Sequence, residues 1–294
     1  MDKKTIKAHL LEAEHHRKTN WLLAVDILEE IIREEPKALE AHEMLYNIYM
    51  DFAAYKKAEW VLKRALSDLP ENDFLYFLMG NLYLTQGGKT WQAIESYEKV
   101  KKRFPELEFN LAVALAQNDR PGQASSLFEK VFPHFQNIAP IYIMLAEQYI
   151  PLGKYEKALR ILQLAEQKFP TNKDVFYLKG RCFYYKNNWI AAYLALDKAR
   201  ELGCHSAEFF NDLARTSERM GDVEKAIFYF KKSIGENAFF VRSYLDLCKL
   251  YLAKEDFKNA KKYLVMAHRL DPSNIFVMIE SEKLKSLQKP STKK

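Results

Sequence analysis

The segment most similar to a catalytic motif is Gly87-Gly88-Lys89-Thr90. A phosphate-binding P-loop ends in this way, because glycine N–H groups surround the phosphates while the lysine and the hydroxyl bind phosphate and Mg²⁺. A complete P-loop has another glycine five residues before the one that precedes the lysine, and Tyr83 occupies that position. A P-loop also follows a strand, whereas a helix is expected to lead into this segment. The spacing therefore predicts a turn between two helices.

Histidine, cysteine and acidic residues are too dispersed for a metal or catalytic site. The seven histidines and three cysteines include no cysteine pair at the two-residue spacing of zinc ligands. His9 and His16 are seven residues apart and Cys204 precedes His205, but neither group supplies three or four ligands. Adjacent acids such as Glu29-Glu30 do not share a helix face. We therefore expect a protein that is not an enzyme and binds no metal or cofactor.

The composition indicates an all-α protein. Of the 294 residues, 48% are hydrophobic, enough for a folded core, and the net charge is only +6. With 9 Gly and 10 Pro, the many tight turns of a β-sandwich or barrel are disfavoured. The odd number of cysteines fits a reducing compartment. The start, Met1-Asp2-Lys3-Lys4, lacks the apolar core of a secretory signal, and no apolar stretch has the length of a membrane span. We expect a cytoplasmic protein without a membrane segment.

An internal repeat supplies the elements that position these residues. A small residue recurs every 31 to 35 residues, as Ala24, Ala58, Ala93, Ala124, Ala158, Ala192, Ala226 and Ala260. Mostly apolar side chains stand four and seven residues later, so the three positions share one face of a helix. A first helix precedes each, with a small residue such as Gly80 or Gly180 that allows close approach. Turn residues such as Gly153-Lys154 separate the two helices. Twelve residues after the alanine a proline often stands and is expected to end the second helix, as at Pro36, Pro70, Pro105, Pro170 and Pro272.

This pattern resembles the tetratricopeptide repeat, a helix-turn-helix unit of about 34 residues. The resemblance covers eight repeats over about residues 5–274 and implies a right-handed α-solenoid, or superhelix, of antiparallel helix-turn-helix repeats. It implies one domain over residues 1–288, with a capping helix at 275–288 and a disordered basic tail at 289–294. In the cap, Ile275, Met278 and Ile279 are expected to pack inward and Glu280 to face solvent.

In this family the first helices line a concave surface that contacts a peptide or a partner helix. By register, the resemblance assigns twelve candidate groove residues to that surface: Met44, Asn47, Phe74, Phe77, Asn81, Phe109, Asn110, Met144, Tyr177, Arg181, Tyr184 and Arg215. Farther along the chain the face becomes charged, with Asp212, Glu218, Arg219, Arg242, Asp246 and Lys249. The asparagines can hydrogen-bond an extended backbone, and the aromatics can anchor an amphipathic segment. The aromatics can equally pack against the neighbouring hairpin, an alternative that the sequence leaves open.

We therefore predict a non-catalytic scaffold or adaptor that binds a peptide or helix of a partner protein in its groove. Phe77 and Tyr184 are expected anchors, whose replacement by Ala should weaken binding and leave the helical fold largely intact. A self-assembling scaffold is an alternative, because Trp60 and Trp91 are expected on outward faces and can support a homo-oligomer. RNA binding is a third alternative, which the small positive charge disfavours.

Overall fold

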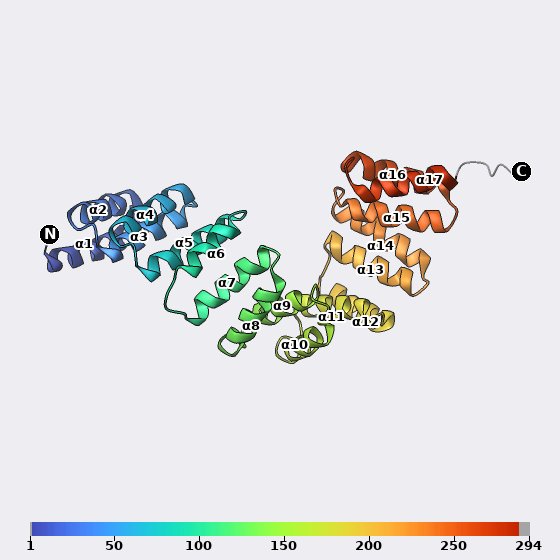
Figure 1. The fold of residues 1–294 in the computed structure, drawn as a ribbon, viewed down its shortest axis with the longest axis horizontal. Helices are drawn as coiled ribbons and strands as arrows, with labels where there is room; N and C mark the ends of the chain where they lie inside the picture. Colours follow the sequence, from blue (N-terminus) through green and yellow to red (C-terminus); the bar gives the residue numbers. More distant parts are fainter. Residues whose placement is uncertain (1, 288–294) are drawn as a thin grey trace, which may run out of the picture. The chain divides into compact units, whose positions relative to one another are not determined.

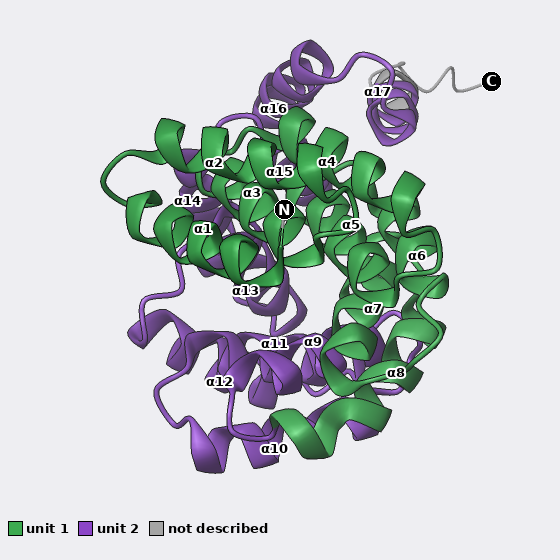
Figure 2. Ribbon diagram, turned by 90° about the vertical axis from the view of Figure 1, so that its left-hand side faces the viewer, with its two compact units in different colours: residues 1–135 green, residues 136–294 purple. Residues whose placement is uncertain are grey.

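The computed structural model describes residues 2–287, with side chains as far as residue 284, and every regular element in this range is an α-helix (Figure 1). The chain folds as two compact units, Met1–Phe135 and Gln136–Lys294, which Figure 2 shows in different colours. Each unit is a stack of helices around a hydrophobic core of its own. The predicted all-α solenoid class is confirmed.

The helix bounds divide between the units as follows. Unit 1 contains α1 (Lys3–His16), α2 (Trp21–Glu34), α3 (Leu39–Asp51), α4 (Tyr55–Asp68), α5 (Asp73–Gln86), α6 (Thr90–Glu98), α7 (Pro105–Gln117) and α8 (Pro121–Phe135). Unit 2 contains α9 (Ala139–Tyr149), α10 (Tyr155–Lys168), α11 (Lys173–Tyr185), α12 (Trp189–Glu201), α13 (Ala207–Arg219), α14 (Val223–Glu236), α15 (Val241–Ala253), α16 (Phe257–Leu270) and α17 (Ile275–Leu287). Within a unit, each odd-numbered first helix pairs with the next, second helix, which also packs against the following hairpin.

The small residue that defines the repeat is buried in all eight hairpins. Each of these alanines is 0% exposed: Ala24, Ala58, Ala93, Ala124, Ala158, Ala192, Ala226 and Ala260. The bulky residue four positions later is also buried in every hairpin, as Phe128 and Phe230 illustrate. The second helices therefore present to the core the face that their periodicity predicts.

Two glycines on first helices allow the predicted close crossings. A Cβ atom added at Gly80 of α5 would lie 2.3 Å from the ring of Tyr97 on α6. One added at Gly180 of α11 would lie 2.6 Å from Cγ of Leu196 on α12. Core atoms are already in contact at normal packing density, so a side chain at either position would force its neighbour to move.

The turns inside several hairpins contain a residue in the left-handed conformation, and in some of them the next residue caps the second helix with its side chain. The φ angles of Gly153, Asn187 and Gly221 are +69°, +58° and +83°, and all three belong to turns expected from the sequence. After Gly221, the side chain of Asp222 accepts a hydrogen bond from the backbone N–H of Lys225 at 3.1 Å. A cap of this kind satisfies one of the unpaired N–H groups at a helix start and is worth about 1 kcal/mol.

Four of the five prolines predicted to end a second helix lie just after one. Pro36, Pro70, Pro170 and Pro272 each follow the last residue of a second helix by two positions, as predicted. The prediction that Pro105 ends a helix is wrong, because α6 already ends at Glu98 and Pro105 begins α7. Proline is tolerated there because the N–H of the first helical residue has no partner within the helix.

The last helix, α17, packs against α15 and α16 as the predicted cap, but with a different face. The sequence predicts that Ile275, Met278 and Ile279 point inward, yet these side chains are 63%, 53% and 51% exposed. The residues that are buried instead are Val277, Glu280 and Leu284. The prediction is wrong because apolar residues occupy two adjacent faces of this helix, and periodicity alone does not choose between them.

The extent of the array stays a prediction. One continuous domain over residues 1–288 depends on how the two units are joined, and each unit is described by itself. The end of the predicted cap, Gln288, and the expected basic tail at residues 289–294 lie outside the described residues.

Candidate functional site

All twelve predicted groove residues lie on first helices, and each is partly exposed. Unit 1 contributes Met44 and Asn47 on α3, Phe74, Phe77 and Asn81 on α5, and Phe109 and Asn110 on α7. Unit 2 contributes Met144 on α9, Tyr177, Arg181 and Tyr184 on α11, and Arg215 on α13. Their role in binding stays a prediction, but their contacts differ between the units.

The aromatic candidates of unit 1 pack within the unit. The Phe77 ring lies 5.1 Å, centroid to centroid, from Phe104 in an edge-to-face arrangement. The Phe109 ring lies 4.9 Å from Phe135 at the end of α8. Phe74 is partly buried against the unit 1 core, as is Met44. These side chains therefore contribute to folding, whatever they contact on their exposed sides.

Asn81 is the centre of a hydrogen-bond network in unit 1. Its Oδ1 accepts a hydrogen bond from the Tyr97 hydroxyl at 2.8 Å and another from Nδ2 of Asn110 at 2.9 Å. Burial raises the pKa of the Tyr97 hydroxyl above its usual value, so the hydroxyl remains a donor at neutral pH. With both lone pairs of Oδ1 engaged, Asn81 has only its NH₂ group to offer a ligand.

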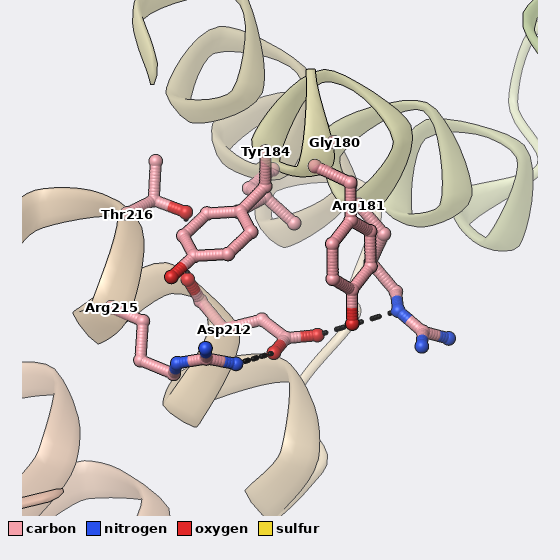
Figure 3. Close-up of a pocket in the computed structure, with 8 residues that line it drawn as sticks. Gly180, Arg181, Tyr184, Asp212, Arg215 and Thr216 are labelled. Carbon is pink, nitrogen blue, oxygen red and sulfur yellow. Dashed lines mark hydrogen bonds and ion pairs between the residues drawn. The ribbon is translucent and has the colours of Figure 1, made fainter. Parts of the chain in front are cut away.

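In unit 2, Asp212 of α13 brings together three of the predicted residues, of which Figure 3 labels Arg181 and Arg215. The Tyr177 hydroxyl donates a hydrogen bond to Oδ2 of Asp212 at 2.9 Å, and Nε of Arg181 lies 3.7 Å from the same oxygen. Nη1 of Arg215 lies 3.9 Å from Oδ1, and Figure 3 shows the two guanidiniums on opposite sides of the carboxylate. Burial raises the pKa of Asp212, while the Arg181 charge and the Tyr177 hydroxyl oppose the shift.

Aromatic rings support the arginines of this surface. The Arg215 guanidinium lies 5.0 Å from the centroid of the Tyr184 ring, and Arg219 lies 5.8 Å from the Trp189 ring. The Tyr184 and Trp189 rings meet edge to face at 5.2 Å. Each cation therefore lies over an aromatic face, which restricts the otherwise mobile side chain.

Three depressions follow one another along α11, α13 and α15. The first lies at Asp212, is the one in Figure 3 and is small, with a volume of about 10 Å³. The second, of about 490 Å³, is lined by Tyr184, Arg215, Glu218, Arg219, Asp246 and Lys249. The third, of about 410 Å³, is lined by Arg215, Arg242, Leu245, Asp246, Lys249, Asn274 and Phe276. Arg215 lines all three, and we call the surface that they form the charged groove.

The sequence analysis missed the part of the charged groove that comes from the start of α17. Asn274 and Phe276 line the third depression, and the Phe276 side chain is 58% exposed. The sequence assigns this segment to a cap without a binding role. A signal was present, because the five apolar residues in 275–279 are more than one buried helix face can hold.

A separate, more apolar depression lies between α16 and α17, away from the charged groove. It has a volume of about 640 Å³, and its lining includes Leu264, Val265, Met278 and Leu284. Among residues 2–287, no helix is long and apolar enough to cross a membrane. In the same range, no three His, Cys, Asp or Glu side chains are grouped as a metal site would require.

Comparisons with known proteins agree with the repeated hairpins. Family models of the tetratricopeptide repeat match residues 75–107 and 207–239. Tetratricopeptide repeat protein 21B of Homo sapiens is 25% identical over 281 residues, covering 85% of this chain and 21% of that protein. BBSome complex member BBS4 of Mus musculus is 25% identical over 257 residues, covering 86% of this chain and 49% of that protein. The chain thus spans about a fifth and about half of the length of these two relatives.

Solved structures share the fold at lower identity. A chain of the APC/C hetero-tetramer Cut9-Hcn1 matches with a TM-score of 0.64 and 16% identity, over 90% of this chain and 52% of that one. PilF of Pseudomonas aeruginosa matches with a TM-score of 0.58 and 20% identity, over 72% of this chain and 97% of that one. YrrB, described as a tetratricopeptide protein with an unusual peptide-binding site, matches with a TM-score of 0.56 and 20% identity, over 60% and 92%. Together with the buried repeat register, these matches show that the chain contains tetratricopeptide repeats.

Proposed function

We propose that the protein is a non-catalytic scaffold that binds an extended or helical segment of a partner protein in the charged groove of unit 2. The observation that carries this proposal is the position of Arg215, which lines all three depressions and joins them into one surface. Rows of side chains from α11, α13 and α15 can each contact a different part of one segment. The predicted groove residues of unit 1 do not belong to this proposal.

The groove residues are ordered before a partner binds. Asp212 restricts Arg181 and Arg215, and the Tyr184 ring stacks beneath Arg215. Association costs less free energy when the contacting side chains are already restricted, because less rotamer freedom is lost. This arrangement supports a preformed binding surface, the mechanism expected of a rigid scaffold.

The relatives support a protein as the partner. Tetratricopeptide repeats commonly serve protein–protein interaction, BBS4 is described as a member of the BBSome complex, and Cut9-Hcn1 is a hetero-tetramer. YrrB is described as having a peptide-binding site. These statements belong to those proteins, and at the identities found they support the class of ligand only. A cytoplasmic location for this chain stays a prediction.

The cysteines support a function without nucleophilic chemistry. Burial raises the pKa of the Cys182 thiol to about 12 and the pKa values of Cys204 and Cys248 to about 11. A thiol with a pKa this high is protonated at neutral pH and is a poor nucleophile. All three side chains are buried and behave as small hydrophobic residues.

Site-specific photo-crosslinking tests the assignment of the groove. A benzoylphenylalanine group replaces Tyr185, which is 42% exposed and lines the first depression, in the full chain. A matched control carries the same group in place of Phe228, an exposed aromatic on the second helix α14. In lysate of the source organism, we expect the group at position 185 to capture defined proteins that unlabelled wild-type chain competes away.

The control decides how the result is interpreted. If position 228 captures the same proteins as strongly as position 185, the segment does not bind in the charged groove and the proposal is wrong. If position 185 captures nothing that competes, while position 228 does, the second helices form the binding surface instead.

Self-association is a second candidate, favoured by the apolar surface at α17. Ile275, Met278 and Ile279 are exposed there, beside the depression between α16 and α17. The outward tryptophans predicted for this role, Trp60 and Trp91, are 53% and 56% exposed. Light scattering over a concentration series separates the candidates, since Ile279→Lys should abolish an oligomer formed through α17 and leave a monomer unchanged.

A further inference from the structure

The charged groove contains more positive than negative groups. Its lining supplies five cations, namely Arg181, Arg215, Arg219, Arg242 and Lys249. It supplies three carboxylates, namely Asp212, Glu218 and Asp246. Partial burial, followed by the nearby Asp246 charge, raises the pKa of Glu218, so this carboxylate loses its charge more readily than an ordinary glutamate as the pH falls. A ligand in the groove therefore meets an excess of positive charge.

The ion pairs inside the groove are longer than most of those outside it. Arg242 and Lys249 lie 3.8 Å and 4.0 Å from the Asp246 carboxylate, beyond the range of a direct hydrogen bond. The two contacts of Asp212 with its arginines, at 3.7 Å and 3.9 Å, are equally long.

Elsewhere in unit 2, ion pairs reach hydrogen-bonding distance, with the exception of Lys283 and Glu280 at 4.0 Å. Lys225 lies 2.8 Å from Asp222 and Arg200 lies 2.7 Å from Asp197. Because charge-assisted hydrogen bonds form at about 2.7–2.9 Å, the groove cations attract their acids but keep donors for an incoming carboxylate.

We infer that the charged groove binds an acidic segment of a partner protein, whose Asp or Glu side chains form direct hydrogen bonds with Arg215, Arg219, Arg242 and Lys249. This inference rests on the proposed function and names the chemistry of its ligand. Arg215 and Arg242 line the third depression together with the exposed ring of Phe276, so an apolar residue of the segment has a neighbour beside the carboxylates.

The pattern of charges favours a peptide over a nucleic acid. Phosphates follow one another along a nucleic-acid strand, and each carries a charge. The groove places Asp212, Glu218 and Asp246 between its cations, so a continuous strand would meet repulsion at each of them. A peptide can place a neutral residue opposite each acid and a carboxylate opposite each cation.

The test compares peptide pools on the full-length chain. One immobilised pool of random peptides of about twelve residues is rich in Asp and Glu, and its counterpart has Asn and Gln at the same positions. We expect the acidic pool to retain roughly tenfold more wild-type chain, because several carboxylate contacts of up to about 1 kcal/mol add together. Equal retention by both pools would overturn the inference without any variant being made.

Two double variants locate the site. Arg219→Gln with Lys249→Gln removes two groove cations and should reduce retention by the acidic pool about tenfold. Arg200→Gln with Lys198→Gln removes the same charges from the outer helix α12 and should change retention less than about twofold. Equal losses in both variants would indicate a general charge effect and overturn the inference. Circular dichroism checks that each variant is folded.

Two further outcomes separate this inference from the proposed function. If single-stranded RNA of random sequence competes more strongly than the acidic pool, and the groove variant loses RNA binding, the ligand is a nucleic acid and the inference is wrong. If crosslinks from position 185 persist in excess acidic pool, the groove binds a protein of other chemistry. The proposed function then stands and the acidic ligand does not.

Discussion

The inner faces of the two units both carry candidate residues on first helices, but the contacts of these residues differ. In unit 1, Phe77 and Phe109 pack against aromatic rings, and Asn81 accepts two hydrogen bonds from neighbouring helices. In unit 2, Tyr177 and Tyr184 also pack against rings, but Tyr184 lines depressions together with Arg215. The difference shows that register selects the helix face, whereas the neighbouring side chains decide whether that face packs or stays accessible.

The physical reason lies in side-chain chemistry. An aromatic ring at the inner face gains free energy by covering apolar surface of the next hairpin, so it packs wherever a neighbouring ring is in reach. A guanidinium keeps its charged end in water and leaves space around it. Unit 2 has arginine at positions 181 and 215 of its first helices, and depressions form there. The following predictions test this contrast, beginning with the largest effect.

Replacing one aromatic residue on each inner face should show which of them stabilises its hairpin and which binds the partner. Phe77→Ala should lower the local stability of the α5–α6 hairpin by about 2 kcal/mol, less than for a fully buried Phe because this ring is partly exposed. Tyr184→Ala should cost α11–α12 about 1 kcal/mol and weaken partner binding more than Phe77→Ala does. Hydrogen exchange measured by mass spectrometry reports both stabilities.

This result would revise the expectation that both substitutions spare the fold. Equal stability losses would mean that the two inner faces pack equally tightly. A larger loss of binding for Phe77→Ala, at a temperature where both variants are folded, would move the site to unit 1.

Substituting the two crossing glycines tests how rigid each crossing is. Gly80→Ala should destabilise unit 1 by about 1.5 kcal/mol, because the added methyl group displaces the buried Tyr97 ring and its hydrogen bond to Asn81. Gly180→Ala should cost about 1 kcal/mol, since Leu196 can change rotamer more easily than a ring can move. Chemical denaturation measures both.

The matched control is Gly235→Ala in α14, where an added Cβ has no neighbour within 4 Å. There the higher helix propensity of alanine should stabilise the protein by up to about 1 kcal/mol. Stabilisation by Gly80→Ala as well would show that the α5–α6 crossing has room for a methyl group.

As the pH falls, one carboxylate of each unit should change the stability of the fold, and the two changes should have opposite signs. In unit 1, hydrogen bonds from Lys63, Lys89 and Tyr83 lower the pKa of Glu59 from 4.5 to about 2. Its stabilising contribution is complete above about pH 4.5 and is lost as the pH falls towards 2. In unit 2, the raised pKa of Glu218 means that protonation favours the folded state as the pH falls to 4.5.

Thermal denaturation between pH 7 and pH 2 measures these contributions, each expected to be below about 1 kcal/mol. Glu59→Gln should flatten the loss of stability between pH 4.5 and 2. Glu218→Gln should raise stability at neutral pH and leave that acid range unchanged. A destabilised Glu218→Gln variant would show that attraction to neighbouring cations outweighs the cost of burying this carboxylate, so that its pKa is lowered by folding.

Much of the fold could be predicted because the same pattern of buried and turn residues recurs in every repeat. Ala158 and Leu162 lie on the buried face of their second helix, and the equivalent residues of the seven other hairpins lie on the same face of theirs. A local exception therefore does not obscure the pattern. The α17 prediction failed because that helix occurs once and has two apolar faces. For a related reason, the sequence could not show which groove aromatics pack and which stay accessible. Phe77 and Tyr184 have similar sequence environments but different neighbours in the structure.

The sequence by itself determined the class of fold, the helix faces and the absence of a recognisable catalytic motif, because helical periodicity and turn chemistry are local properties. Tertiary structure decided which inner-face residues remain accessible, because that depends on side chains from other hairpins. Asp212 illustrates this most directly. It is an ordinary acid in the sequence, but in the structure it holds Tyr177 and lies between Arg181 and Arg215, 3.7 Å and 3.9 Å away, at the surface where we place the partner.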